Sequence, residues 1–164
     1  MIFGMTPYTL FHVLLSLIGI FTGLIALFGM IAGKRLDTWN GVFLVTTALT
    51  SITGFFFPFH GLTPGYILGV LSLIVLAVAF PARYTKHLAG RWRRAYAITA
   101  SIALYFNVFV LIAQLFMKVP ALHVLAPKGS EPPFLISQVV MMAVFIVLTI
   151  AAAIKFHPDV VHAS

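Results

Sequence analysis

The sequence predicts an all-α fold, a polytopic transmembrane helix bundle of five spans that forms a single integral membrane domain over residues 1–164. Hydrophobic residues make up 62% of the chain and charged residues only 8%, whereas soluble domains carry about 25% charged residues. Five apolar runs are long enough, or nearly so, to cross a bilayer as helices, which takes roughly 17 to 25 residues. Water therefore cannot be the main solvent of this chain.

The five predicted spans follow one another with short connections. In chain order they cover residues 7–33, 39–59, 65–82, 95–117 and 133–156. Pro133 suits the first turn of the last helix. A cleaved signal peptide is not expected, because no positive residue precedes the first run and the run is too long for a signal core. Spans two and three could instead form a re-entrant pair, but their lengths favour full crossing.

The basic residues indicate how the bundle is oriented. One side of the predicted bundle carries eight of the ten: Lys34, Arg35, Arg83, Lys86, Arg91, Arg93, Arg94 and Lys155. The other side has only Lys118 and Lys128. Because cytoplasmic loops are enriched in Lys and Arg, this bias predicts an N-terminus outside and a C-terminus in the cytoplasm. We expect an integral membrane protein, with the bacterial inner (plasma) membrane as its location.

The loop between spans three and four contains the only dense charge cluster: Arg83, Lys86, Arg91, Arg93 and Arg94. We interpret it as a membrane-surface or partner-binding segment. Its simpler role is to lie against anionic lipid headgroups at the cytoplasmic face. Each cation there contributes about 1 kcal/mol to the free energy of attraction to the membrane surface. Its alternative role is to dock an acidic partner. The position between two apolar runs argues against nucleic acid as the partner, despite the net charge of +7.

Hairpin geometry predicts that four polar side chains share one layer near the outer face. His12 lies about 24 residues before the turn between spans one and two, and His60 about 24 after it, so at 1.5 Å per residue the two are level. Gln114 and Gln138 lie at equal distances from the turn between spans four and five. The four side chains are therefore expected at one depth.

Helical spacing suggests that this layer faces the interior. Gly19 and Gly23 recur with His12 on one face of span one, and Asn107 shares a face with Gln114 on span four. The sequence thus predicts an outward-opening polar His/Gln pocket. Its candidate ligand-binding residues are His12, His60, Gln114, Gln138 and Asn107. The ordinary alternative is that the histidines reach water at helix ends and the amides bond between helices.

Histidine is the main candidate ligand, because the chain has no cysteine. Two neutral imidazoles at one depth can hold a haem b, and the phenylalanines nearby would suit a quinone. A metal ion could use His12, His60 and His123. These possibilities form a redox hypothesis and leave open whether the protein is an enzyme.

Two alternatives stand beside the redox hypothesis. The first is a non-catalytic membrane subunit or assembly or interaction factor, which would bind a membrane protein partner or form a homo-oligomer. The second is a transporter, which would have to act as an oligomer. No Asp or Glu lies within a predicted span, so the carboxylates common in proton- and sodium-coupled carriers are missing.

Overall fold

The computed structural model describes residues 6–34, 36–56 and 64–156, and every regular element in these ranges is helical. The elements are α1 (Pro7–Ile31), α2 (Asp37–Gly54), α3 (Pro64–Phe80), the π-helical turn η1 (Pro81–Thr85), α4 (Arg91–Lys118), the short α5 (Pro120–His123) and α6 (Pro132–Lys155). The all-α prediction is confirmed. Four stretches are long and apolar enough to cross a membrane: Pro7–Ile31, Tyr66–Thr85, Arg91–Lys118 and Pro132–Lys155.

The helix α2 differs from the other long helices in composition. It is 18 residues long and carries Asp37 and Asn40 in its first turn, followed by several threonines. These polar residues make α2 less apolar than the four stretches that qualify as membrane spans. The predicted second span continued to residue 59, and residues 57–63 lie outside the described part of the chain. Four spans are therefore supported by length and composition, and the fifth is not.

Proline and glycine mark the ends of the helices. Pro7 opens α1, where its missing N–H costs no helical hydrogen bond, and the hydroxyl of Thr6 accepts the N–H of Thr9 at 3.2 Å. The chain leaves α1 through Gly33, whose positive φ of 76° suits the left-handed residue after a helix. The last helix begins at Pro132, one residue before the predicted start.

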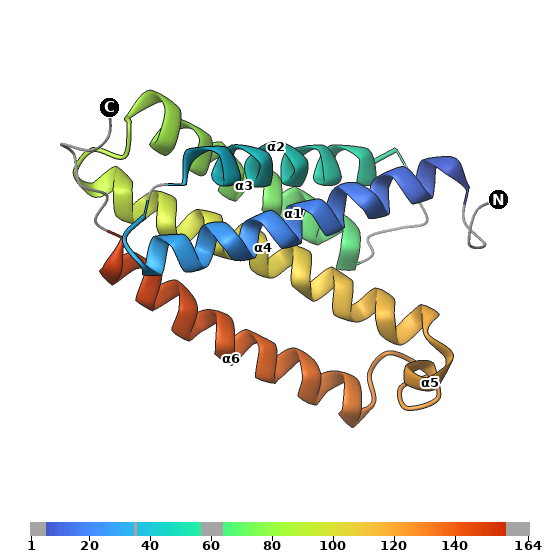
Figure 1. Cartoon of the computed structure of the whole chain (residues 1–164). Helices are drawn as coiled ribbons and strands as arrows, with labels where there is room; N and C mark the ends of the chain where they lie inside the picture. Colours follow the sequence, from blue (N-terminus) through green and yellow to red (C-terminus); the bar gives the residue numbers. More distant parts are fainter. Residues whose placement is uncertain (1–5, 35, 57–63, 157–164) are drawn as a thin grey trace.

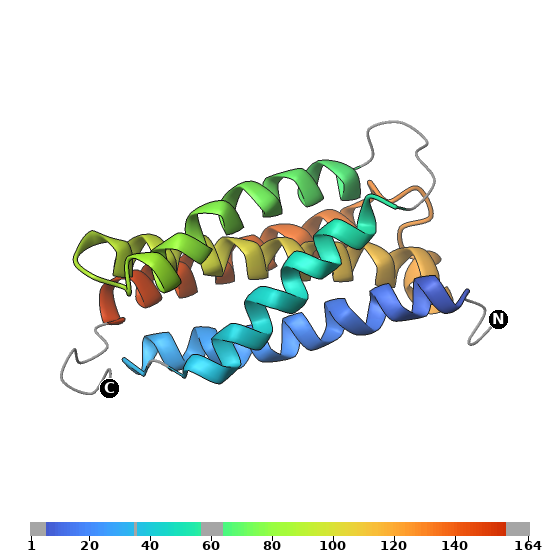
Figure 2. The same cartoon turned by 90° about the horizontal axis from the view of Figure 1, so that it is seen from above.

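The helices run up and down the bundle, with α4 at its centre. Figures 1 and 2 show α1 to α4 alternating in direction, with α6 alongside α4. The helix α4 contacts α1, α2, α3 and α6, whereas α6 contacts α4 and α1 and leaves its remaining surface exposed. This outer surface of α6 is apolar along the helix, from Leu135 to Ile154. Exposed apolar side chains on this scale fit a hydrocarbon environment rather than water.

The two ends of the bundle differ in charge. The turns after α1 and α3 and the end of α6 lie together at one end, which we call the basic end (Figure 1). Its described basic residues are Lys34, Arg83, Lys86, Arg91, Arg93, Arg94 and Lys155. The opposite end carries Lys118 and Lys128. The described basic residues that the sequence placed on one side of the bundle therefore do lie at one end of the fold.

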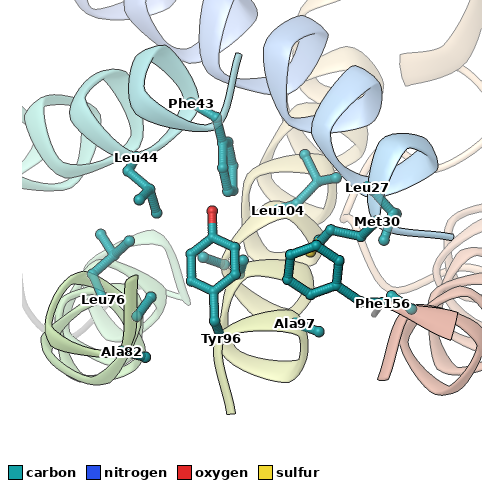
Figure 3. Packing of buried hydrophobic residues seen from close by; sticks show 14 of the residues in the cluster. Leu27, Met30, Phe43, Leu44, Leu76, Ala82, Tyr96, Ala97, Leu104 and Phe156 are labelled. Carbon is teal, nitrogen blue, oxygen red and sulfur yellow. The ribbon is translucent and has the colours of Figure 1, made fainter. Parts of the chain in front are cut away.

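Several of the largest fully buried side chains lie near the basic end. Tyr96 and Phe43 are fully buried there, together with Leu27 and Met30 of α1. Figure 3 shows Tyr96 of α4 among these side chains, with its hydroxyl oxygen directed toward α2 near Phe43. A buried hydroxyl in such surroundings needs a hydrogen-bond partner, and α2 supplies it, as described below.

The predicted loop between spans three and four is largely ordered into helix. Its first part forms η1, in which the N–H of Lys86 bonds the carbonyl of Pro81 at 2.8 Å. Its last part is the first turn of α4, which begins at Arg91 instead of the predicted Ala95. Between them Leu88 has a φ of 59° and is buried. Burial of this leucine against the core offsets the cost of its left-handed backbone.

Candidate functional site

His12 lies where α1 crosses the end of α2. Its Nδ1 is 2.8 Å from the hydroxyl oxygen of Thr53, and a Cβ on Gly54 would come within 3.5 Å of its ring. The hydroxyl of Thr53 also lies 2.7 Å from the carbonyl of Leu49, to which it donates its only proton. In the tautomer of His12 that carries its proton on Nδ1, Thr53 accepts from the ring while donating to its own helix.

His60 lies outside the described residues, so its pairing with His12 stays a prediction. The depth match assumed a hairpin centre between Leu36 and Asp37. In the structure α1 ends at Ile31 and α2 begins at Asp37, and His12 lies beside Thr53 in the last turn of α2.

His123 lies on the short helix α5, and its side chain is exposed. Among the residues that the structure describes, no group of three or more His, Cys, Asp or Glu side chains is arranged to hold a metal ion. The metal site of His12, His60 and His123 is therefore not supported by the described geometry.

The two glutamines of the predicted layer lie in different surroundings. Gln114 is exposed on α4, so it does not line an interior pocket. Gln138 of α6 is buried, and its amide nitrogen donates to the carbonyl of Phe109 on α4 at 3.2 Å. Its carbonyl oxygen is buried with no hydrogen-bond partner in the described part of the chain. Gln138 thus fastens α6 to α4, and Gln114 takes no part in this contact.

Asn107 is buried, as its face predicted, and it bonds between helices. Its amide nitrogen donates to the hydroxyl of Thr47 on α2 at 3.1 Å. The helix α1 passes close to this pair through Gly19, where a Cβ would lie 3.2 Å from the hydroxyl oxygens of Thr46 and Thr47. The absence of a side chain on Gly19 therefore lets three helices meet around one amide–hydroxyl bond. Gly19, on the face of span one that helical spacing directed inward, thus packs against α2.

The sequence reasoning missed a polar network at the basic end. The guanidinium of Arg83, only 2% exposed, pairs with the carboxylate of Asp37 at the start of α2. Its carbon lies 5.0 Å from the centre of the Tyr96 ring, and the Tyr96 hydroxyl donates to the side-chain oxygen of Asn40. The network joins α2, η1 and α4. The signal that could have revealed it is the pair of polar residues, Asp37 and Asn40, one turn apart.

Arg83 accordingly does not belong to the exposed cationic surface that was predicted for it. Lys86, Arg91 and Arg94 are exposed, and Arg93 is half-buried with its Nε lacking a hydrogen-bond partner among the described residues. The ammonium of Lys86 lies 5.6 Å from the centre of the Trp92 ring. The predicted cluster therefore divides into one structural arginine and a group at the surface.

A shallow apolar groove of about 320 Å³ lies on α6, lined by Ala143, Val144, Val147 and Leu148. Its lining has no polar group, so it offers no means of fixing a polar ligand. The polar side chains described above lie on other surfaces and pair across helix contacts. Comparison with known proteins adds no candidate activity: no protein-family model matches the chain, and neither the curated proteins nor the solved structures include a match.

Proposed function

We propose that this chain is a non-catalytic integral membrane protein, a small subunit or an assembly or interaction factor, whose buried polar groups fasten its own helices. The observation that carries the proposal is the pairing of these groups across helices. The pairs are Asn107 with Thr47, Tyr96 with Asn40, and Gln138 with the main chain of α4. In a bilayer such groups have no water to bond, so interhelical bonds of this kind hold membrane helices together.

We place all five long helices across the bilayer, α2 included. Eighteen helical residues span about 27 Å, close to the roughly 30 Å of a hydrocarbon core. The ion pair between Asp37 and Arg83 supports this placement, because it joins the start of α2 to the end of α3 at one end of the bundle. By the positive-inside rule the basic end then faces the cytoplasm, with the N-terminus outside. The bacterial inner membrane is the proposed location.

The role of a subunit requires a face that contacts another membrane protein or a second copy, and we place it on α6. Support comes from the outer surface of this helix, which neither α4 nor α1 covers. Because the chain has no cysteine, Val147→Cys provides a single reactive thiol on this face. Disulfide-linked dimers under mild oxidation in membranes would identify a second copy. Phe28→Cys, exposed on α1, is the control.

A redox role is the second candidate, and the geometry of His12 is the observation that favours it. A histidine whose Nδ1–H is held by a hydrogen bond presents Nε2 in a fixed orientation, as in many haem and metal ligands. Thr53 provides such a bond. The role would require a second ligand, for which His60 was the predicted residue.

An absorption spectrum and a metal analysis of the detergent-purified protein distinguish the two candidates. The proposed structural role predicts no Soret band and no stoichiometric metal. A Soret band that disappears in His12→Ala, while the variant keeps its helical content, would instead establish the redox role. His123→Ala serves as the matched control, because its side chain is exposed on α5.

A further inference from the structure

The exposed cations at the basic end outnumber the carboxylates that can neutralise them. Five of those in the described part of the chain are exposed: Lys34, Lys86, Arg91, Arg94 and Lys155. The whole sequence contains three acidic side chains. Asp37 pairs with the buried Arg83, and Glu131 lies at the opposite end, where it accepts the main-chain N–H of Lys128. The third acidic side chain, Asp159, lies outside the described residues.

Three of these cations and an exposed indole ring surround the first turn of α4. Lys86 stacks on Trp92, and Arg91 and Arg94 are three residues apart in the first turn of α4, which puts them on one side of the helix. We call Lys86, Arg91, Trp92 and Arg94 the headgroup surface. Cations are unfavourable at a helix start, where the main chain already carries partial positive charge. The first turn of α4 has no acidic residue and no side-chain cap.

Indole rings indicate the depth of this surface. Trp92 is 38% exposed and Trp39 40% exposed, and both lie at the basic end. Exposed tryptophans beside apolar helices are typical of the boundary between hydrocarbon and headgroups. Cations at that boundary lie at the level of lipid phosphates, and guanidinium groups bind phosphate through two parallel hydrogen bonds.

We propose that the headgroup surface binds the phosphate of an anionic phospholipid, with Arg91 and Arg94 contacting the phosphate and Trp92 packing at the glycerol level. The proposal rests on the membrane placement given under the proposed function. An anion at this position neutralises the excess charge and also compensates the uncapped start of α4. A lipid fits the site better than a soluble acidic protein, because exposed tryptophans such as Trp92 are typical of the boundary between hydrocarbon and headgroups.

The test measures lipid enrichment beside Trp92 directly. In the Trp39→Phe background Trp92 is the only tryptophan, since the chain has two. The protein is reconstituted in phosphatidylcholine bilayers that contain equal mole fractions of brominated phosphatidylglycerol or brominated phosphatidylcholine. We expect stronger quenching by the anionic lipid, with a local enrichment of roughly fivefold for each contributing cation, and a decrease when salt is raised from about 0.1 M to about 1 M.

Matched variants localise the effect. Arg91→Gln/Arg94→Gln should remove most of the preference, whereas Lys118→Gln/Lys128→Gln at the opposite end should leave it unchanged. Equal quenching by both lipids, with the headgroup surface unsubstituted, would overturn the proposal. An acidic protein would then be the better candidate partner for these cations. The salt titration uses the same Trp39→Phe protein throughout and needs no substitution at the headgroup surface, so a folding defect caused by such a substitution cannot mimic the result. A haem or metal signal would contradict the proposed structural role without altering this enrichment.

Discussion

At the scale of single residues, the threonines of α2 show how a polar helix can pack in an apolar bundle. The hydroxyl groups of Thr46, Thr50 and Thr53 donate to main-chain carbonyls four residues earlier, at 2.6 to 2.7 Å. Each hydroxyl is thus satisfied within its own helix, and its burial costs little. Thr47 differs, because its hydroxyl accepts a bond from α4.

The bond between Asn107 and Thr47 should therefore contribute measurable coupling between α2 and α4. We expect Asn107→Leu and Thr47→Val each to destabilise the bundle, with a coupling free energy of about 0.6 kcal/mol, the average for such bonds in membrane proteins. A double-mutant cycle on thermal or denaturant unfolding in detergent measures it. The matched control is the cycle of Asn107→Leu with Thr99→Val, because Thr99 bonds only its own helix. Equal coupling in both cycles would contradict this account.

Gly23 is expected to tolerate no large side chain. A Cβ there would lie 2.7 Å from Leu104 and from Phe43, closer than atoms can approach without displacement. We predict that Gly23→Leu lowers the free energy of unfolding by about 1 to 3 kcal/mol, the usual cost of overpacking. Ile18→Leu, on the exposed side of α1, should have little effect. Unchanged stability of Gly23→Leu would mean that the contact does not form.

Residue patterns predicted the parts of the candidate site that depend only on which face of a helix a residue occupies. The small-residue face of α1 and the inward face of Asn107 followed from helical spacing, which needs no knowledge of the turns. The predicted depth of His12 depended on where the hairpin turns. The structure places His12 beside Thr53, and its predicted partner His60 lies outside the described residues. Gln114 shares the face of Asn107 but lies near the helix end, beyond the contact.

At the scale of elements, the ion pair of Asp37 and Arg83 links α2 to η1. Asp37→Asn should destabilise the protein, because it leaves the guanidinium buried without a carboxylate. Fully buried pairs lose about 3 to 5 kcal/mol in this way, and we expect less here because the Asp37 side chain is 65% exposed. Asp37→Asn/Arg83→Met should be more stable than Asp37→Asn, since it removes the buried charge. Thermal unfolding in detergent compares the stability of the two variants, with Lys155→Gln as the surface control. A double variant less stable than Asp37→Asn would contradict the explanation that the unpaired buried guanidinium causes the loss.

Hydropathy located the long helices because a bilayer-length helix needs a continuous apolar run. It could not locate η1, since a π-helical turn arises from the packing at the end of α3 and not from composition. It also placed the start of α4 four residues late, because arginines lower hydropathy without preventing helix formation. The orientation of Arg83 into the bundle depends on this turn.

At the scale of the whole molecule, the account requires that the turn after α1 and the turn after α3 lie on the same side of the membrane. This requirement follows if α2 crosses the bilayer. If α2 did not cross, the two turns would lie on opposite sides, since α3 alone would separate them. The ion pair of Asp37 and Arg83 supports the first arrangement.

The most direct measurement is the accessibility of single cysteines to a membrane-impermeant maleimide. The chain has no cysteine of its own, so Ala32→Cys, Ala89→Cys and Ser130→Cys, all exposed, each report one turn. We predict that only Ser130→Cys is labelled in intact cells, and that the other two are labelled after the membrane is permeabilised. Labelling of Ala32→Cys and Ala89→Cys from opposite sides would contradict the five-span bundle.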